Sequence, residues 1–260
     1  MLIQFEKYQG AGNDFILVDN RNGAYNSLGI DQIVGLCNRH YGIGSDGFIF
    51  INASSDSDFE MDFYNPDGSK SFCGNGARCA VAFANTLDIN SSTQTFQAID
   101  GMHAYSFTDT SVAIHMGDVN QIECFGVDAA FIHTGSPHYM VLSDDLSTEN
   151  TLSIGRSIRF SETYVAEGVN VNLIRMKSSH EIDVSTYERG VEYETLACGT
   201  GATACALFQA YKNELHQGEI IVNAKGGKLA VRFVRNESGF EQIWLAGPAV
   251  KVFNGQIFLP

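Results

Sequence analysis

Proline, tryptophan and basic residues are scarce in this sequence. Only 4 of the 260 residues are proline and 1 is tryptophan, and 16 lysines and arginines stand against 30 aspartates and glutamates. The formal net charge is −14, and no basic stripe of the kind that nucleic-acid binders carry is visible. We therefore expect no nucleic-acid partner, while the acidic excess favours solubility.

Long apolar runs and a targeting segment are also missing. No stretch approaches the roughly 20 apolar residues that cross a bilayer, and the opening MLIQFEK lacks the basic-then-apolar layout of a secretory signal. We expect a cytoplasmic protein that does not enter a membrane. Hydrophobic residues make up 44% of the chain, enough for one large domain or two modest ones.

The six cysteines include no Cys-x-x-Cys pair. In the cytoplasm they should be reduced, and neighbouring cysteines are spaced more widely than in the usual zinc knuckle. We expect neither a metal site nor a thiol-redox centre. Four of the six are interpreted as small, buried side chains: Cys37, Cys79, Cys124 and Cys205.

The most informative feature is a short segment that occurs twice. Cys73 opens CGNGA, and Cys198 opens CGTGA 125 positions later. Residues 96–104 also recur, more loosely, as residues 222–230. This internal repeat predicts two similar lobes that bring two thiols to one cleft.

Most of the sequence reads as strands and turns. Period-two alternation predicts strands over residues 59–63 and 112–116. A hairpin is expected from residues 228–234 and 242–245, and Asn254-Gly255 between apolar pairs indicates a tight turn.

Two alanine-rich segments interrupt this pattern. Residues 76–87 and 201–212 are compatible with helices and are apolar on nearly every side, which predicts two buried central helices wrapped by sheet. Shorter helices are expected over residues 31–39 and after Ser153.

Each motif cysteine stands immediately before a predicted helix. The first N–H groups of a helix have no internal partner and the dipole there favours negative charge, so a thiol at this position ionises more readily. The glycines let the backbone approach an anion such as a substrate carboxylate. With two such turns on one carboxylate, one thiolate can remove the α proton while the opposite thiol returns a proton to the other face.

Beyond these turns, the sequence resembles the diaminopimelate epimerase family. The matching segments run in family order along nearly the whole chain: GAGNDF at 10–15, NPDGS at 65–69, CGNGARC at 73–79, TGSPH at 134–138, GVNVN at 168–172, YERG at 187–190 and CGTG at 198–201.

The resemblance implies an isomerase that interconverts LL- and meso-diaminopimelate without a cofactor, in lysine and peptidoglycan-precursor synthesis. It also implies a homodimer and an α+β fold of two pseudo-symmetric lobes, each a mostly antiparallel β-sheet or barrel wrapped around a central α-helix. We place residues 1–117 and 249–260 in the lobe with Cys73, and residues 118–248 in the lobe with Cys198.

Site residues follow from the same resemblance. Cys73 matches the family's proton donor and Cys198 its proton acceptor, with roles that exchange with reaction direction. His138 and Glu188 match polar positions near the cysteines. The positions expected to bind substrate are Asn13, Asn65, Gly74, Asn75, Ser136, Asn170, Glu188, Arg189, Gly199 and Thr200.

Taken alone, several of these residues also have a purely structural interpretation. Asn65 lies in Asn-Pro-Asp-Gly, a good turn sequence. Glu188 and Arg189 can form a solvated surface pair. Asn13, beside a glycine, can belong to a turn, and His138, after a proline, can be a loop histidine with its hydrogen bonds satisfied.

Two positions depart from the family pattern, and a third residue, Asn75, argues against another enzyme family of the same fold. Ser136 stands where members often have Asn, so a water is expected to fill the space. Gly47 stands where some have Gln, so that contact is lost or supplied elsewhere. The alternative, a proline racemase or hydroxyproline epimerase, usually has His where Asn75 stands.

Overall fold

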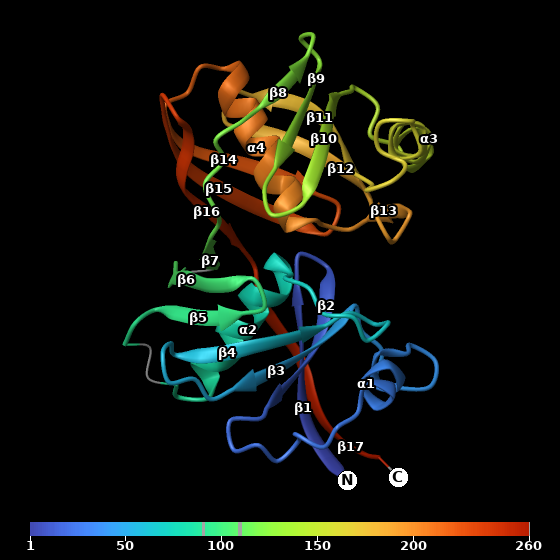
Figure 1. The fold of residues 1–260 in the computed structure, drawn as a ribbon, viewed down its shortest axis with the longest axis vertical. Coiled ribbons are helices and arrows are strands. Elements are labelled where there is room, and N and C mark those ends of the chain that lie inside the picture. Colours follow the sequence, from blue (N-terminus) through green and yellow to red (C-terminus); the bar gives the residue numbers. More distant parts are fainter. Residues whose placement is uncertain (90–91, 109–110, 260) are drawn as a thin grey trace. The chain divides into compact units, whose positions relative to one another are not determined.

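The computed structural model describes residues 1–89, 92–108 and 111–259 and has an α+β fold. The chain divides into two compact units (Figure 1). The first comprises Met1–Ile114 and Gly247–Pro260, and the second comprises His115–Ala246. Both are rich in strands, as the short alternating segments predicted.

The first unit is a continuous series of paired strands. In chain order its elements are β1 (Leu2–Gly10), β2 (Asn13–Asp19), α1 (Ile30–Cys37), β3 (Gly47–Asn52), β4 (Phe59–Tyr64), α2 (Gly74–Thr86), β5 (Thr95–Ala98), β6 (Gly101–Phe107), β7 (Val112–His115) and β17 (Val250–Phe258). The pairs β2–β3 and β4–β5 are parallel, and the pairs β17–β1, β1–β2, β3–β4, β5–β6 and β6–β7 are antiparallel.

The second unit repeats this plan. Its elements are β8 (Glu123–Phe125), β9 (Ala129–His133), β10 (Pro137–Leu142), α3 (Thr148–Arg159), β11 (Asn170–Ser178), β12 (Glu181–Glu188), β13 (Tyr193–Thr195), α4 (Gly199–Lys212), β14 (Gln217–Ala224), β15 (Gly227–Asn236) and β16 (Gly239–Gly247). Here β10–β11 and β12–β14 are parallel, and β9–β10, β11–β12, β14–β15 and β15–β16 are antiparallel.

The two units therefore share one order of parallel and antiparallel pairs. The register also repeats: Phe15 lies opposite Gly47, and Met140 opposite Asn172, which are the positions 125 residues further on. The repeat seen in the sequence is thus a repeat of strand topology as well as of the cysteine segments.

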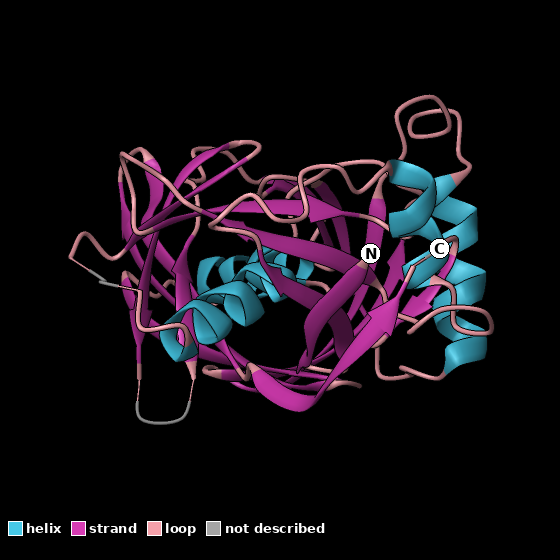
Figure 2. Ribbon diagram, turned by 90° about the horizontal axis from the view of Figure 1, so that it is seen from below, coloured by secondary structure: helices cyan, strands magenta, loops and turns pink. Residues whose placement is uncertain are grey.

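A central helix fills each unit, as the alanine-rich segments predicted. Most residues of α2 and α4 are buried, including all their alanines except the partly buried Ala82, and strands of the same unit lie around each helix (Figures 1 and 2). Alanine serves this place because its small side chain lets strands pack close to the helix on every side. Strand β4 and the hairpin of β15 and β16 also form where alternation predicted them.

Two predictions about local structure were wrong. Asn254-Gly255 makes no turn, because β17 runs through it and Gly255 pairs with Phe5 of β1. A Cβ on Gly255 would lie 2.8 Å from Cζ of Phe5, so the glycine makes room for that ring. Helix α3 begins at Thr148 rather than after Ser153, because Ser147 caps it by accepting a hydrogen bond from the Asn150 N–H.

Among the described residues, no helix combines the length and the apolar character needed to cross a bilayer.

Candidate active site

Cys73 is the N-cap residue of α2, as predicted. Its sulfur accepts a hydrogen bond from the N–H of Gly76 at 3.5 Å. Gly74 and Asn75 form the first turn of the helix and are buried. The thiol therefore lies at the positive end of a helix dipole, and it is only partly buried.

Asn13 lies beside this thiol at the start of β2. Its side-chain oxygen is 3.8 Å from the Cys73 sulfur and accepts a hydrogen bond from the Asn75 amide at 3.3 Å. Arg78, fully buried in α2, donates to the Asn75 oxygen at 2.8 Å and so fixes which way that amide points. The structure thus brings three predicted residues together: Asn13, Cys73 and Asn75.

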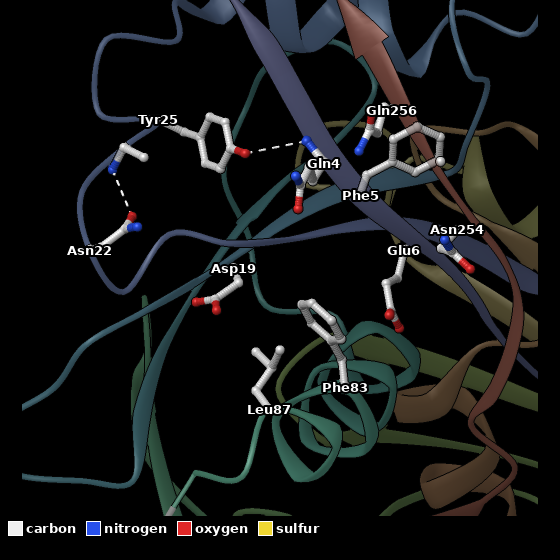
Figure 3. A pocket seen from close by; sticks show the side chains of 12 residues that line it. Gln4, Phe5, Glu6, Asp19, Asn22, Tyr25, Phe83, Leu87, Asn254 and Gln256 are labelled. Atoms are coloured by element: carbon white, nitrogen blue, oxygen red, sulfur yellow. Dashed lines mark hydrogen bonds between the residues drawn. The ribbon is translucent and has the colours of Figure 1, made fainter.

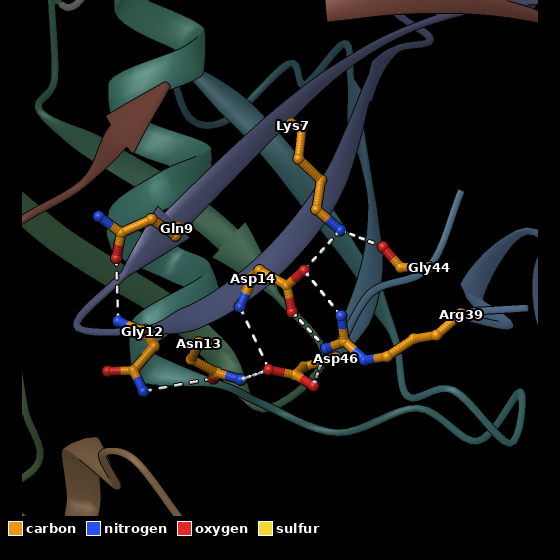
Figure 4. Close-up of polar contacts among 9 residues, drawn as sticks. Lys7, Gln9, Gly12, Asn13, Asp14, Arg39, Gly44 and Asp46 are labelled. Carbon is orange, nitrogen blue, oxygen red and sulfur yellow. Dashed lines mark hydrogen bonds and ion pairs between the residues drawn. The ribbon is translucent and has the colours of Figure 1, made fainter. Parts of the chain in front are cut away.

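Sequence reasoning missed a charge network that holds Asn13 (Figure 4). Asp46 accepts a hydrogen bond from the Asn13 amide at 2.7 Å, and Arg39 bridges Asp46 and Asp14 at 2.6 Å to each. The nearly buried Lys7 pairs with Asp14 at 2.7 Å. Because a carboxylate only accepts, Asp46 forces the Asn13 oxygen to face the thiol.

The same network shifts the ionisation of Asp14. Burial disfavours its charged form, but hydrogen bonds from Arg39 and Lys7 outweigh burial and lower the pKa of Asp14 to about 2. Asp14 is therefore an anion at any physiological pH.

Asn65 builds the turn that precedes Cys73. Its amide donates to the Ser69 carbonyl and to the hydroxyls of Ser69 and Ser71, and its carbonyl accepts from Gly68. This is the turn that its sequence favoured, and it shapes the segment leading to the cysteine.

Cys198 is the N-cap residue of α4, in the position that Cys73 has in α2. Gly199 and Thr200 open the helix, and the Thr200 hydroxyl lies 3.4 Å from the Cys198 sulfur. Thr134 donates to the Thr200 carbonyl at 2.8 Å. The hydroxyl of Thr200 is therefore a polar neighbour of this sulfur.

His138 is a buried strand residue rather than a loop residue. It lies on β10, and its Nε2 is 2.9 Å from the Thr200 hydroxyl oxygen. Burial lowers the pKa of His138 to about 3, and the charges of His133 and Arg189 act in the same direction. The imidazole is neutral at physiological pH and connects through Thr200 to Cys198.

Asn172, which sequence reasoning missed, lies on the other side of this imidazole. Its amide is 3.1 Å from Nδ1 of His138, and its oxygen accepts from the Thr186 hydroxyl at 2.9 Å. Asn172 is fully buried on β11. The signal for it was the alternation in Asn170-Val171-Asn172, which places both amides on one side of a strand.

Ser136 and Asn170 are joined to Arg189. The Asn170 amide donates to the Ser136 hydroxyl at 2.9 Å, and the Asn170 oxygen accepts from the Arg189 backbone N–H at 2.9 Å. The Arg189 guanidinium donates to the Glu167 carbonyl. Glu188 ends β12 and is half-buried.

The remaining cysteines divide in two. Cys37, Cys79 and Cys205 are buried, as predicted, and burial raises the pKa of Cys79 to about 12. The prediction was wrong for Cys124, which is exposed because all three residues of the short strand β8 are exposed.

Gly47 has no room for a side chain such as the glutamine of the family pattern considered above. A Cβ there would lie 2.4 Å from Cε2 of the Phe63 ring. An aromatic ring therefore occupies the space into which a longer side chain at this position would start.

A separate cavity of about 360 Å³ in the first unit contains none of the predicted site residues (Figure 3). It is lined by Gln4, Phe5, Glu6, Asp19, Asn22, Ala24, Tyr25, Phe83, Leu87, Asn254, Gly255 and Gln256. In the part of the chain that the structure describes, no group of three or more His, Cys, Asp or Glu side chains is arranged to hold a metal ion.

Comparison with known proteins connects this geometry to a family. A family model described as diaminopimelate epimerase matches residues 5–122 and 130–252. The chain belongs to the diaminopimelate epimerase family. The resemblance read from the sequence motifs is confirmed, and an epimerase is an isomerase.

Curated relatives with this name match over nearly their whole length. One from Flavobacterium psychrophilum is 42% identical, covering 96% of this chain and 98% of the relative. Others are from Chlorobaculum tepidum (38% identical, covering 96% and 99%) and Aquifex aeolicus (35% identical, covering 98% of each).

Solved structures share the fold at much lower identity. A phenazine biosynthesis protein of the PhzF family from Bacillus anthracis is 14% identical with a TM-score of 0.76, covering 100% of both chains. A probable proline racemase from Agrobacterium radiobacter is 12% identical with a TM-score of 0.69, covering 99% of this chain and 93% of that one. These likenesses confirm the predicted α+β fold class.

Proposed function

We propose that the protein interconverts LL- and meso-diaminopimelate without a cofactor, using Cys73 and Cys198 as acid and base. The observation that carries the proposal is the duplicated cysteine at the N-terminus of a buried helix, in a chain of this family. Both helix N-termini carry the positive end of a helix dipole, which suits a carboxylate.

The reaction moves one proton in and one proton out. A thiolate removes the proton on the α carbon, and the pair of electrons from that C–H bond is left on carbon next to the carboxylate. The opposite thiol then delivers its proton to the other face, which inverts the centre and leaves that sulfur as the thiolate. We assign Cys73 as donor and Cys198 as acceptor in one direction, with the roles exchanged in the other.

The remaining predicted residues would hold the substrate. Gly74, Asn75, Gly199 and Thr200 would bind the reacting carboxylate through their backbone N–H groups. The second amino-acid head needs ligands for both a carboxylate and an ammonium group, which amides and a guanidinium supply. For this head we propose Asn13, Asn65, Ser136, Asn170, Glu188 and Arg189.

Isotope exchange tests the proposal directly. Pure protein incubated with LL-diaminopimelate in deuterated water should place deuterium at one α position and produce the meso isomer, without added pyridoxal phosphate. Cys73→Ala and Cys198→Ala should each abolish inversion, whereas Cys124→Ala should keep it. No exchange by folded wild-type protein would reject the proposal, and equal losses in all three variants would indicate a folding defect.

We also propose that the protein works in the cytoplasm as a homodimer, in the synthesis of lysine and of peptidoglycan precursors. The support for a dimer is the apolar surface of β17, where Val252 is 56% exposed and Phe258 is 78% exposed. Exposed apolar side chains gathered on a strand favour contact with another copy.

A further inference from the structure

The contacts around His138 determine which atom donates and which accepts in each of its hydrogen bonds. The Asn172 amide nitrogen also lies 3.5 Å from the Tyr139 carbonyl, which can only accept. This contact and the Thr186 hydroxyl at the Asn172 oxygen place the amide N–H groups toward Nδ1 of His138. Nδ1 must then accept, so the single proton of the neutral ring is on Nε2.

With its proton on Nε2, His138 donates to the oxygen of Thr200. The Thr200 hydroxyl hydrogen is then available to the sulfur of Cys198 at 3.4 Å. Hydrogen bonds to the charged form of an acid favour that form. The hydrogen-bond chain from Asn172 through His138 to Thr200 therefore ends in a hydroxyl that can donate to the Cys198 thiolate.

Close packing against α4 holds the side chains of this hydrogen-bond chain in place. A Cβ on Gly201 would lie 2.6 Å from Oδ1 of Asn172 and 3.2 Å from Cε1 of His138. Only a glycine in the first turn of α4 lets both side chains lie against the helix. At the position that matches the buried Arg78 of α2, α4 carries Thr203, whose hydroxyl donates to the Gly199 carbonyl.

We propose that Asn172 is a positioning residue for Cys198: by donating to Nδ1 of His138 it holds the imidazole proton on Nε2, which leaves the Thr200 hydroxyl to donate to the Cys198 sulfur. The role of this hydrogen-bond chain in proton transfer rests on the proposed function. The low pKa of His138, which comes first from burial and then from the electrostatic effects of His133 and Arg189, agrees with a neutral ring.

Thiol titration without substrate tests the donor. The rate at which iodoacetamide alkylates Cys198 is measured against pH in the full chain by peptide mass spectrometry, with the exposed Cys124 as internal reference. Thr200→Val should raise the apparent pKa of Cys198 by about one to two pH units, the size expected for one hydrogen bond to a charged group. Thr200→Ser should restore the wild-type profile, and an unmoved midpoint in Thr200→Val would overturn the proposal.

Nitrogen-15 NMR of the histidine rings tests the role of Asn172. The chain has seven histidines, so His138 is assigned by its loss in His138→Gln. Wild-type protein should show protonated Nε2 and unprotonated Nδ1. Asn172→Asp, which replaces the donor by an acceptor of the same size, should protonate Nδ1, and Asn172→Leu should raise the Cys198 midpoint.

A proton on Nδ1 in the wild type, or an unchanged ring in Asn172→Asp, would contradict the assignment. Neither measurement needs turnover. If the wild-type protein shows the expected shifts but is inactive, the proposed epimerase function is rejected and the proposed hydrogen-bond chain stands. If it is an active epimerase without these shifts, only the hydrogen-bond chain is rejected.

Discussion

At the residue scale, the side chains beside the two cysteines are fixed by partners that only accept or only donate. Asp46 only accepts, and it orients Asn13 toward Cys73. The Tyr139 carbonyl only accepts, and it orients Asn172 toward His138. An amide can point either way in isolation, so these partners decide which atom of Asn13 faces Cys73 and which atom of Asn172 faces His138.

Asp14 makes a prediction about acid stability. Its pKa is about 2 in the folded protein and about 4 in an unfolded chain. The unfolded state therefore binds the proton first, so the contribution of Asp14 to stability is complete above about pH 4 and is lost as the pH falls toward 2. The urea midpoint of the wild-type protein should fall as the pH is lowered from about 4 to 2. Asp14→Asn should have a lower urea midpoint than wild type at pH 6, and its midpoint should fall less between pH 4 and pH 2.

The exposed loop carboxylate Asp56 supplies the control. Asp56→Asn should follow the wild-type curve at every pH. If Asp14→Asn and wild type fall in parallel between pH 4 and pH 2, the acid sensitivity comes from other groups.

The two cysteines were easier to predict from the sequence than the side chains that hold their neighbours in place. Cys73 and Cys198 could be predicted as helix N-caps because the repeat and the alanine-rich segments are local signals. The contacts of Asn172 with His138 and of Asp46 with Asn13 could not be predicted, because strand register and a loop bring these residues together from more than 30 positions away.

At the element scale, the start of α4 is packed more tightly than the start of α2. A Cβ on Gly201 would lie 2.6 Å from Asn172, whereas a Cβ on Gly76 would have no neighbour nearer than a methyl group of Ile49 at 3.3 Å. The equivalent glycines of the two repeats therefore tolerate a methyl group differently.

Gly201→Ala should displace Asn172 and His138 and lower kcat/KM by about tenfold or more, since overpacking costs about 1–3 kcal/mol. Helix content should be unchanged, because alanine favours a helix over glycine. Gly76→Ala, the matched variant, should lose less activity. Equal losses in steady-state assays would show that the difference in packing has no consequence for catalysis.

Helix α3 shows why element boundaries escaped prediction. Its buried residues include Thr151 and Gly155, which are not apolar signals, so its first turn read as a loop. Likewise the tight-turn pattern at Asn254-Gly255 came from a glycine that is needed opposite Phe5. In both cases a partner distant in the sequence decided the local structure.

At the scale of the whole molecule, the apolar surface of β17 predicts the assembly state. Analytical ultracentrifugation should give twice the 28.4 kDa of one chain. Val252→Glu with Phe258→Glu should shift the protein to a monomer, because charged side chains would be buried without partners. Val165→Glu, at a residue 52% exposed in the second unit, is the control and should remain dimeric. A monomeric wild type would contradict the proposal.

The pairing of β1 with β17 has a consequence for synthesis on the ribosome. Strand β1 emerges first, but its neighbour β17 follows the entire second unit in the chain. Residues 115–246 can collapse as soon as they leave the exit tunnel, whereas the first unit must wait for a strand translated after them. In nascent chains stalled before residue 250, β1 should therefore lack its partner strand β17, while the second unit should already be folded.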